Sequence, residues 1–369
     1  LPQEFGRHTT LSREILRRVE DLLDRGDFTL GKEVAEFEEA FAVQCGTKYA
    51  VGVNSGTDAL KLILRACHVG TGDGIITTPN SFVATVGAIL EVGAQPVFMD
   101  IGDDFLMLPE GPYRFKIPDG VKLASYPKYR LPVHWAGNIS YSNRLHIEDA
   151  CQAIGATYKG RPAGSLGVAA AFSLHPLKNV NVWGDGGVVT TNDEGLAQEI
   201  RLLRNHGLQD RNTCVMPGIN SRLDTIQAIV GLEVLKELGW VTDARIAHAK
   251  RYDEGLRDIK EITIPPRDPD IKQVYHLYQI EIPHTLNPEL RSAFIAFLAN
   301  KGIDAKIHYP IPLHLMPGFK HLGYQRGDFP RAEWFADNHV TLPIHQYLSD
   351  AQIDHVIEAI HEFYQTPRR

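Results

Sequence analysis

The sequence contains few cysteines, no long apolar run and no excess of basic residues. Its four cysteines (Cys45, Cys67, Cys151 and Cys214) are scattered over 369 residues, without a CxxC pair or the spacing of a metal site. This pattern excludes a disulfide scaffold and predicts free thiols in a reducing cytoplasm, with no metal bound. No run of about 18 apolar residues occurs, so no membrane span is expected. The first ten residues also lack the apolar core of a signal peptide.

Basic residues do not dominate the charge, because 38 Lys and Arg stand against 45 Asp and Glu, a net charge of −7. A nucleic-acid partner is therefore not expected, since a phosphate backbone requires a basic surface. With 43% hydrophobic and 22% charged residues, the composition is that of a globular protein and not of a disordered or collagen-like chain. The length corresponds to two or three domains of about 150 residues each.

Stretches with the apolar period of strands alternate along the chain with stretches that have the period of helices. Helices are predicted over 12–25, 34–45, 58–67, 82–91, 192–203, 223–256 with a break near Gly239, 288–302 and 349–364. Strands are predicted over 49–54, 74–79, 96–100, 131–137, 145–151, 169–174, 186–191, 274–282 and 305–310. Ser349 is expected to cap the last helix, and 104–130 to be irregular. This alternation indicates an α/β fold with a mostly parallel sheet covered by helices.

Polar residues gather at the carboxyl ends of the predicted strands, the edge at which open α/β sheets bind ligands. Asp149 is either a turn residue or a carboxylate that keeps a pyridinium nitrogen protonated. Lys178, in a loop between two apolar strands, is either an exposed lysine or a partly buried amine that can form a Schiff base. The turn Ser55-Gly56-Thr57 opens a helix whose N–H groups can hold a phosphate. Phe82 belongs to the core or covers a flat ring.

In this order, the segments NSGTDAL, NSFVAT, EDACQA and FSLHPLKNVNVWGDGG resemble the DegT/DnrJ/EryC1/StrS sugar aminotransferases. These are fold-type I enzymes that depend on pyridoxal 5′-phosphate (PLP). The resemblance extends over nearly the whole chain, from GDFTLGKEVAEFEEAFA to TLPIHQYLS. It implies a three-layer α/β fold with a mostly parallel central sheet in a large PLP-binding domain over 1–240. A smaller C-terminal α+β domain over 241–369 is implied as well.

The resemblance also implies roles for individual residues. Lys178 matches the lysine that forms the Schiff base and moves the proton, and Asp149 matches the acid paired with the pyridine nitrogen. Gln152 matches the position near the phenolic oxygen, and Phe82 matches the position over the ring. The phosphate positions are matched by Gly56, Thr57, Ser173 and, from the neighbouring subunit, Asn220. Positions near the sugar are matched by His175, His206, His308 and Tyr309. The stretch IHYPIPLH either lines the sugar pocket, with His314 included, or is a packed strand and its exit turn.

The implied activity is transfer of an amino group from L-glutamate to a keto-sugar, expected to be nucleotide-linked, by a cytoplasmic homodimer with shared active sites. Some relatives carry His in place of the lysine and perform dehydration, so Lys178 favours amino transfer. The alternatives are a PLP-dependent sugar dehydratase and a PLP-fold regulatory protein whose site is not used. An aminated sugar formed with consumption of glutamate would distinguish amino transfer from dehydration. No Schiff-base absorbance and an unchanged Lys178→Ala variant would favour the regulatory protein.

One segment departs from the family pattern. A helix usually joins the strands that match LPVHW and LHIED, but here only the eight residues 137–144 lie between them. A parallel crossover with its own helix needs about 10–12 residues or more. We therefore expect either an open loop or a wrong strand assignment, with consequences for stability and for a substrate lip near Trp135.

Overall fold

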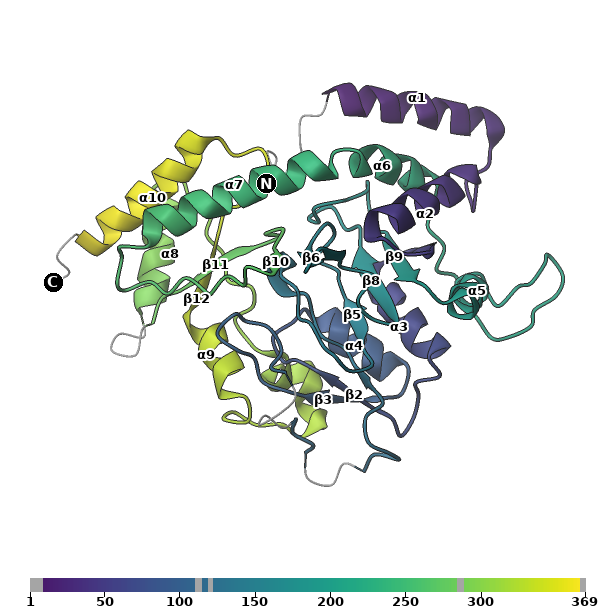
Figure 1. Ribbon diagram of the computed structural model, residues 1–369, viewed down its shortest axis with the longest axis horizontal. Helices are drawn as coiled ribbons and strands as arrows, with labels where there is room; N and C mark the ends of the chain where they lie inside the picture. Colours follow the sequence, from purple (N-terminus) through teal and green to yellow (C-terminus); the bar gives the residue numbers. More distant parts are fainter. Residues whose placement is uncertain (1–8, 110–114, 119–121, 284–288, 366–369) are drawn as a thin grey trace.

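The computed structural model describes residues 9–109, 115–118, 122–283 and 289–365, with a sheet at its centre (Figure 1). This central sheet has two hydrogen-bonded parts, of strand order β3-β2-β4 and β5-β8-β9-β1. Parallel bridges from Arg130 to His146 and from Val133 to Asp149 connect them. The strands are β1 (Tyr49–Val53), β2 (Gly74–Thr77), β3 (Gln95–Phe98), β4 (Tyr129–Arg130), β5 (Ile147–Asp149), β8 (Ala169–Ser173) and β9 (Gly187–Thr191). Only the pairs that β9 makes with β1 and β8 are antiparallel among these strands of the described chain. The α/β class is therefore confirmed, with one reversed strand.

Successive residues of the strands enter two different apolar clusters, as the alternation of side chains along a strand requires. Phe172 and Val188 pack on one face of the sheet, and Ala171 and Val189 on the other. The first face is covered by α1 (Thr9–Arg25), α2 (Lys32–Cys45) and α6 (Thr225–Leu235). The second is covered by α3 (Gly56–Ala66), α4 (Val83–Glu91) and α5 (Glu194–Leu203). Helices thus lie on both sides of this sheet.

Helix α7 (Leu238–Leu256) links the sheet to the C-terminal part of the chain (Figure 1). Its first residue, Leu238, belongs to the apolar cluster of α2 and α6, whereas Tyr252 and Leu256 belong to the C-terminal cluster. The predicted break near Gly239 lies slightly earlier, between Leu235 and Leu238, and Gly239 is inside α7.

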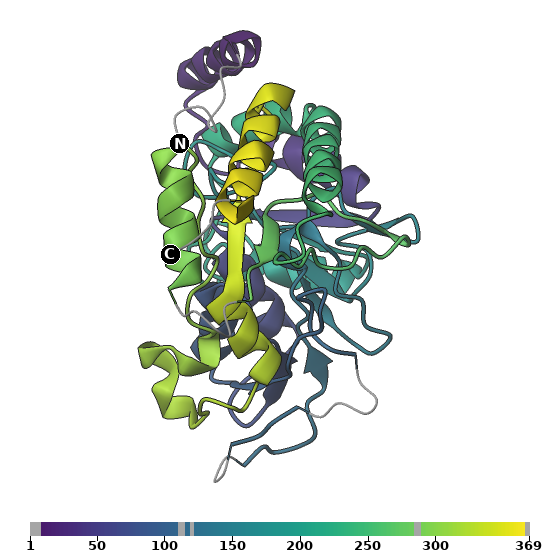
Figure 2. The same ribbon diagram turned by 90° about the vertical axis from the view of Figure 1, so that its left-hand side faces the viewer.

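The C-terminal part contains the antiparallel strands β11 (Tyr278–Glu281) and β12 (His339–Leu342). Helices α8 (Leu290–Asn300) and α10 (Asp350–Gln365) pack on them next to each other (Figure 2), and α9 is Pro330–Asn338. Ser349 caps α10 as predicted, because its hydroxyl accepts a hydrogen bond from Gln352 N at 3.3 Å. Pro288, in the predicted helix 288–302, lies outside the described residues.

Two strand predictions here were wrong in extent or in kind. The strand expected over 274–282 is limited to 278–281. The segment 305–310 is not a strand, and only Lys306 bridges to Thr341. Pro310 and Pro312 have no N–H to donate, which prevents this segment from extending as a ladder.

The remaining elements are short. Three strands form a small sheet: β6 (Thr157–Tyr158), β7 (Arg161–Pro162) and β10 (Ile271–Lys272). The 3-10 helices are η1 (Trp135–Gly137), η2 (Leu313–Leu315) and η3 (Pro317–Leu322). No helix in the described part of the chain combines the length and the apolarity needed to cross a membrane.

The segment that departs from the family pattern also departs from our strand prediction. The strand expected over 131–137 is wrong, because β4 ends at Arg130 and the turn η1 follows, with positive φ at Ala136 (58°) and Gly137 (83°). Residues 138–144 form no helix, as expected for so short a link. Trp135 is 1% exposed and is therefore not part of an exposed lip.

The region 104–130 is irregular where it is described, as predicted, except that its last two residues form β4 (Tyr129–Arg130). Residues 110–114 and 119–121 lie outside the described residues. The region nevertheless contributes to the core, because its side chains cover an apolar surface of β2, β3 and the residue after β3. The covered side chains are Ile76, Val97 and Met99, and the covering ones are Met107, Leu108, Phe115 and Leu123.

Candidate active site

The N-terminus of α3 forms a small cradle at the carboxyl end of β1. Ser55 caps the helix: its hydroxyl accepts from Asp58 N (3.1 Å) and its carbonyl from Ala59 N (2.9 Å). The N–H groups of Gly56 and Thr57 keep no acceptor among the described residues, so they can bind an anion. A Cβ on Gly56 would lie 2.8 Å from Ser173 Cβ and 2.9 Å from Cys151 Sγ. Only glycine fits there, and three of the predicted segments meet at this point.

Asp149 ends β5 with a carboxylate that is 5% exposed and surrounded by donors. Thr85 Oγ1 donates to Asp149 Oδ2 at 2.7 Å, and Ser81 Oγ lies 2.6 Å from Thr85 Oγ1. Cys151 N donates to Asp149 Oδ1 at 3.3 Å. An ionised carboxylate only accepts hydrogen bonds, so Thr85 uses its proton on Asp149 and accepts the proton of Ser81. The sequence motif NSFVAT contained Ser81 and Thr85, but only Phe82 was assigned from it.

Gln152 is held by the turn η1. Its Oε1 accepts a hydrogen bond from Ala136 N at 2.7 Å, and no described residue accepts one from its Nε2. The amide orientation leaves two N–H donors of Nε2 unused among the described residues.

Lys178 lies in the loop after β8, close to Asp149 and Cys151. Its backbone is fixed on both sides: Lys178 N donates to His175 O (2.8 Å), and its carbonyl accepts from Asn181 Nδ2 (3.0 Å). Burial lowers the pKa of Lys178, and Cys151 and Asp149 counteract this only in part. A lowered pKa increases the fraction of neutral amine, which is the nucleophilic form.

His276 was not predicted from the sequence, although it is close to several predicted residues. Burial lowers its pKa well below the ordinary value, and Lys178, His308 and His175 lower it further. Its Nδ1 is buried without a hydrogen-bond partner in the described part of the chain. No motif pointed to it, because it lies in the middle of an apolar segment. The electrostatic influence of Lys178, His308 and His175 places this residue near the predicted site.

The aromatic rings of Tyr309, Phe82 and Trp135 form a cluster with Tyr309 at its centre. The ring of Tyr309 lies 5.8 Å from that of Phe82 and 5.8 Å from that of Trp135, and burial raises the pKa of Tyr309 to about 12. His308 Nδ1 is 3.1 Å from Thr341 Oγ1. Phe82 itself is 50% exposed and is therefore available to cover a ligand.

Other predicted residues have different surroundings. His175 is exposed near Ser173, whose hydroxyl accepts from His175 N at 3.3 Å. His206 and Asn220 are exposed on two adjacent segments, where His206 N donates to Ile219 O at 2.9 Å. Neither of them forms a hydrogen bond to Lys178 within the described residues.

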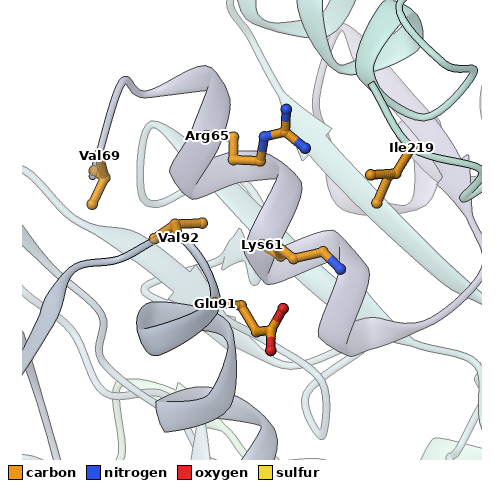
Figure 3. A pocket seen from close by; sticks show the side chains of 6 residues that line it. All are labelled: Lys61, Arg65, Val69, Glu91, Val92 and Ile219. Carbon is orange, nitrogen blue, oxygen red and sulfur yellow. The ribbon is translucent and has the colours of Figure 1, made fainter. Parts of the chain in front are cut away.

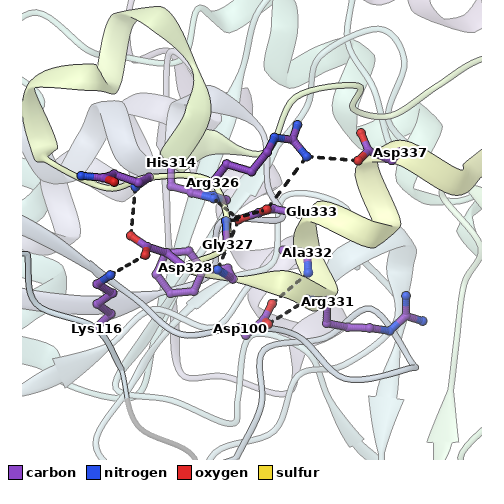
Figure 4. A network of polar contacts seen from close by, with 12 residues as sticks. Asp100, Lys116, His314, Arg326, Gly327, Asp328, Arg331, Ala332, Glu333 and Asp337 are labelled. Carbon is purple, nitrogen blue, oxygen red and sulfur yellow. Dashed lines mark hydrogen bonds and ion pairs between the residues drawn. The ribbon is translucent and has the colours of Figure 1, made fainter.

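His314 does not line a sugar pocket. It is 1% exposed, and its Nε2 lies 3.0 Å from Glu333 Oε1, within the polar network of Figure 4. Glu333 also accepts from Gly327 N at 2.8 Å, and Asp328 of the same loop pairs with Lys116. For this residue, the packing interpretation of IHYPIPLH is correct.

A surface pocket lies elsewhere, between α3 and the end of α4 (Figure 3). It is lined by Lys61, Arg65, Val69, Glu91, Val92 and Ile219, none of which was assigned to cofactor or sugar. Among the described residues, no group of three His, Cys, Asp or Glu side chains could hold a metal ion.

Comparisons with known proteins identify the family and the fold. Residues 9–361 match the profile of the DegT/DnrJ/EryC1/StrS aminotransferase family. A dTDP-3-amino-3,4,6-trideoxy-alpha-D-glucose transaminase of Streptomyces venezuelae is 38% identical over 93% of this chain and 90% of its own. A pleiotropic regulatory protein of Geobacillus stearothermophilus is 36% identical over 96% and 95%. The crystal structure of S. venezuelae DesV with a ketimine intermediate has a TM-score of 0.88 and 34% identity, covering 98% of this chain and 97% of that one.

Proposed function

Because the chain belongs to the DegT/DnrJ/EryC1/StrS aminotransferase family, we propose that it uses PLP at Lys178 to convert a keto-sugar into an amino sugar. The observation that carries the proposal is the partly buried Lys178, whose pKa is lowered, beside the carboxylate of Asp149 at the ends of β8 and β5. The name of the S. venezuelae transaminase supports the same reaction.

The residues present fit PLP. The cradle at Gly56 has no room for a Cβ and has two free N–H groups for a phosphate, with Thr57 and Ser173 beside it. Asp149 would pair with the pyridine nitrogen, and the free amide donors of Gln152 would serve the phenolic oxygen. Phe82 would cover the ring. When bound, PLP supplies a conjugated ring that accommodates the electron pair released as a C–H bond breaks.

The chain's own groups move the proton. Neutral Lys178 Nζ takes the proton from the α-carbon of the amino acid, and in the second half-reaction it delivers a proton to the sugar carbon that becomes the amine carbon. The carboxylate of Asp149, fixed by Thr85, stabilises positive charge on the group paired with it. Two half-reactions on one site predict parallel lines in double-reciprocal plots.

We further propose a nucleotide-linked sugar and L-glutamate as the two substrates, and a homodimer with shared sites. The relative's dTDP-sugar product supports the nucleotide. The exposed Asn220, on a segment separate from Lys178, supports a contribution to the phosphate site of a neighbouring copy. His175, His206, His308 and Tyr309 are the candidates for sugar contacts.

The architecture we propose is fold type I with three layers, a PLP-binding domain over 1–240 and an α+β domain over 241–369. The separate C-terminal core around Tyr252 and Phe294 supports this division. We place the enzyme in the cytoplasm, and its four unpaired cysteines agree with a reducing compartment.

The proposal is tested by incubating the PLP-loaded protein with L-glutamate and a panel of nucleotide-linked keto-sugars. Mass spectrometry should detect an aminated sugar and 2-oxoglutarate, and Lys178→Ala should form neither. A product that has lost one water molecule and carries no new amino group would instead establish dehydration.

A regulatory role is the second candidate, because the G. stearothermophilus relative has a regulatory name. It predicts that the protein shows no Schiff-base absorbance with PLP and that Lys178→Ala changes no property. Either a wild-type absorbance band that disappears in Lys178→Ala or an aminated product would contradict it.

A further inference from the structure

The carboxylate of Glu148, next to Asp149 in β5, is fully buried and has four hydrogen-bond donors. Three are the N–H groups of Gly164, Leu166 and Gly167, each at 2.8 Å. The fourth is His134, whose Nε2 lies 2.9 Å from Glu148 Oε2, and both side chains are 0% exposed. The proposed reaction uses neither residue.

The hydrogen bonds determine the proton on the imidazole. Ser140 N donates to His134 Nδ1 at 3.3 Å, so Nδ1 carries no proton and Nε2–H donates to Glu148. Burial alone would raise the pKa of Glu148, but the hydrogen bonds from His134, Gly164 and Gly167 together keep it below its ordinary value. The pair is therefore a neutral imidazole that donates to a carboxylate.

His134 is also the residue from which the turn η1 starts. Its backbone N donates to Asp149 O at 3.0 Å, and its carbonyl accepts from Gly137 N at 3.3 Å. Ala136, two residues later, donates its N–H to Gln152 Oε1 at 2.7 Å. The positive φ of Ala136 is costly for a residue with a Cβ, so the turn needs supports on both sides. On the His134 side of the turn, these supports are the contacts that the imidazole makes with Glu148 and Ser140.

We propose that the His134–Glu148 pair is a positioning device that holds the turn η1, so that Ala136 N fixes the amide of Gln152 with its N–H donors towards the phenolic oxygen of PLP. The inference rests on the proposed function. His134 acts only through Gln152 and touches neither substrate nor cofactor. Ser140 belongs to the shortened link 137–144, so the hydrogen bond from Ser140 N to His134 Nδ1 also holds this link in place.

The test is an absorbance titration of the PLP Schiff base in four proteins: wild type, Gln152→Ala, His134→Phe and the double variant. A donor at the phenolic oxygen stabilises the phenolate most when the imine is unprotonated. Its loss should therefore raise the pKa of the imine, by about 1 for one hydrogen bond to a charged group. We expect the same upward shift in Gln152→Ala and His134→Phe, and no additional shift in the double variant.

Two controls separate positioning from general damage. His134→Gln retains a donor that can reach Glu148 and should restore most of the wild-type imine pKa. Glu148→Gln keeps the volume of the side chain but removes the charge, and it should shift the imine pKa in the same direction as His134→Phe. This variant decides the question if His134→Phe does not fold.

Three results would overturn the proposal. The first is a shift in Gln152→Ala without one in His134→Phe or, if that variant does not fold, in Glu148→Gln. The second is additive shifts in the double variant, and the third is no shift in Gln152→Ala. Absence of a Schiff-base band in wild type would instead contradict the proposed function, so the two failures are distinguishable.

Discussion

Substituting Gly56 tests the cradle directly, because its surroundings leave no space for a methyl group. In Gly56→Ala the new Cβ would lie 2.8 Å from Ser173 Cβ, 2.9 Å from Cys151 Sγ and 3.2 Å from Ser173 Cα. Carbon atoms in contact are separated by about 3.5–4.0 Å. The first residue of α3 and the end of β8 must therefore move apart by more than half an ångström.

Overpacking of this kind costs about 1–3 kcal/mol. Since the displaced atoms surround the free N–H groups of Gly56 and Thr57, we expect part of this cost to appear in cofactor binding. A loss of about 1.4 kcal/mol of binding free energy would raise the Kd of PLP about tenfold. The assay is a titration of the cofactor-free protein with PLP, followed by absorbance, together with urea unfolding of the same samples.

Gly87→Ala is the matched control, because Gly87 lies inside α4 and a Cβ there meets no atom within 4 Å. It should leave the Kd of PLP unchanged and stabilise the protein by up to about 1 kcal/mol, through helix propensity alone. Adding Cys151→Ala to Gly56→Ala removes one of the close contacts and should recover part of the loss. A Gly56→Ala protein with wild-type stability and wild-type PLP affinity would refute the reasoning.

Three further measurements test the charges and hydrogen bonds. Thr85→Val should lower the free energy of unfolding in urea by about 1.5–3 kcal/mol, because Asp149 loses a buried donor, and Thr85→Ser should lose much less; equal losses would contradict the hydrogen bond. Lys178→Met should stabilise the cofactor-free protein at neutral pH, because burial lowers the pKa of Lys178 and so disfavours its charged form. As the pH rises through this lowered pKa towards the ordinary lysine value, the wild type loses the charge and the difference should shrink; a constant difference would contradict the burial. Burial lowers the pKa of His339 to about 3, so between about pH 6.5 and 3 only the unfolded chain binds this proton. On acidification, the free energy of unfolding of wild type should therefore fall by up to about 1.4 kcal/mol per pH unit more than that of His339→Phe. Parallel pH profiles of the two proteins in urea unfolding would contradict the lowered pKa of His339.

The polar ends of the strands could be predicted because they are local features. Asp149 ends a short apolar run at the carboxyl edge of the sheet, and Lys178 lies in a loop between two further runs. The resemblance to the family then assigned both to one site. The reversal of β9 could not be predicted in the same way. A five-residue run such as Gly187–Thr191 carries no signal of direction, since its apolar side chains enter both clusters either way.

Helix α9 shows why other elements were missed. Its first turn is capped from a distant segment: the carboxylate of Asp100, after β3, accepts from Arg331 N and Ala332 N at 2.9 Å each. A cap more than 200 residues away in the chain leaves no local signature, unlike the Ser349 cap of α10. The same reasoning applies to Trp135, whose Nε1–H finds its acceptor on Gln279 Oε1 at 2.7 Å only once the C-terminal part has packed.

The altered segment 104–144 is compatible with an intact site because different contacts hold the segment and the site in place. Asp149 is held by Thr85 from α4, and the Gly56 cradle is formed by Ser173 and Cys151, all outside this segment. What the segment contributes to the site is the turn that follows His134, since Ala136 orients Gln152. A shortened link is therefore tolerated on one condition, that the backbone near Ser140 still reaches the imidazole of His134. Loss of that contact would alter the position of the Gln152 amide while leaving the Gly56 cradle unchanged.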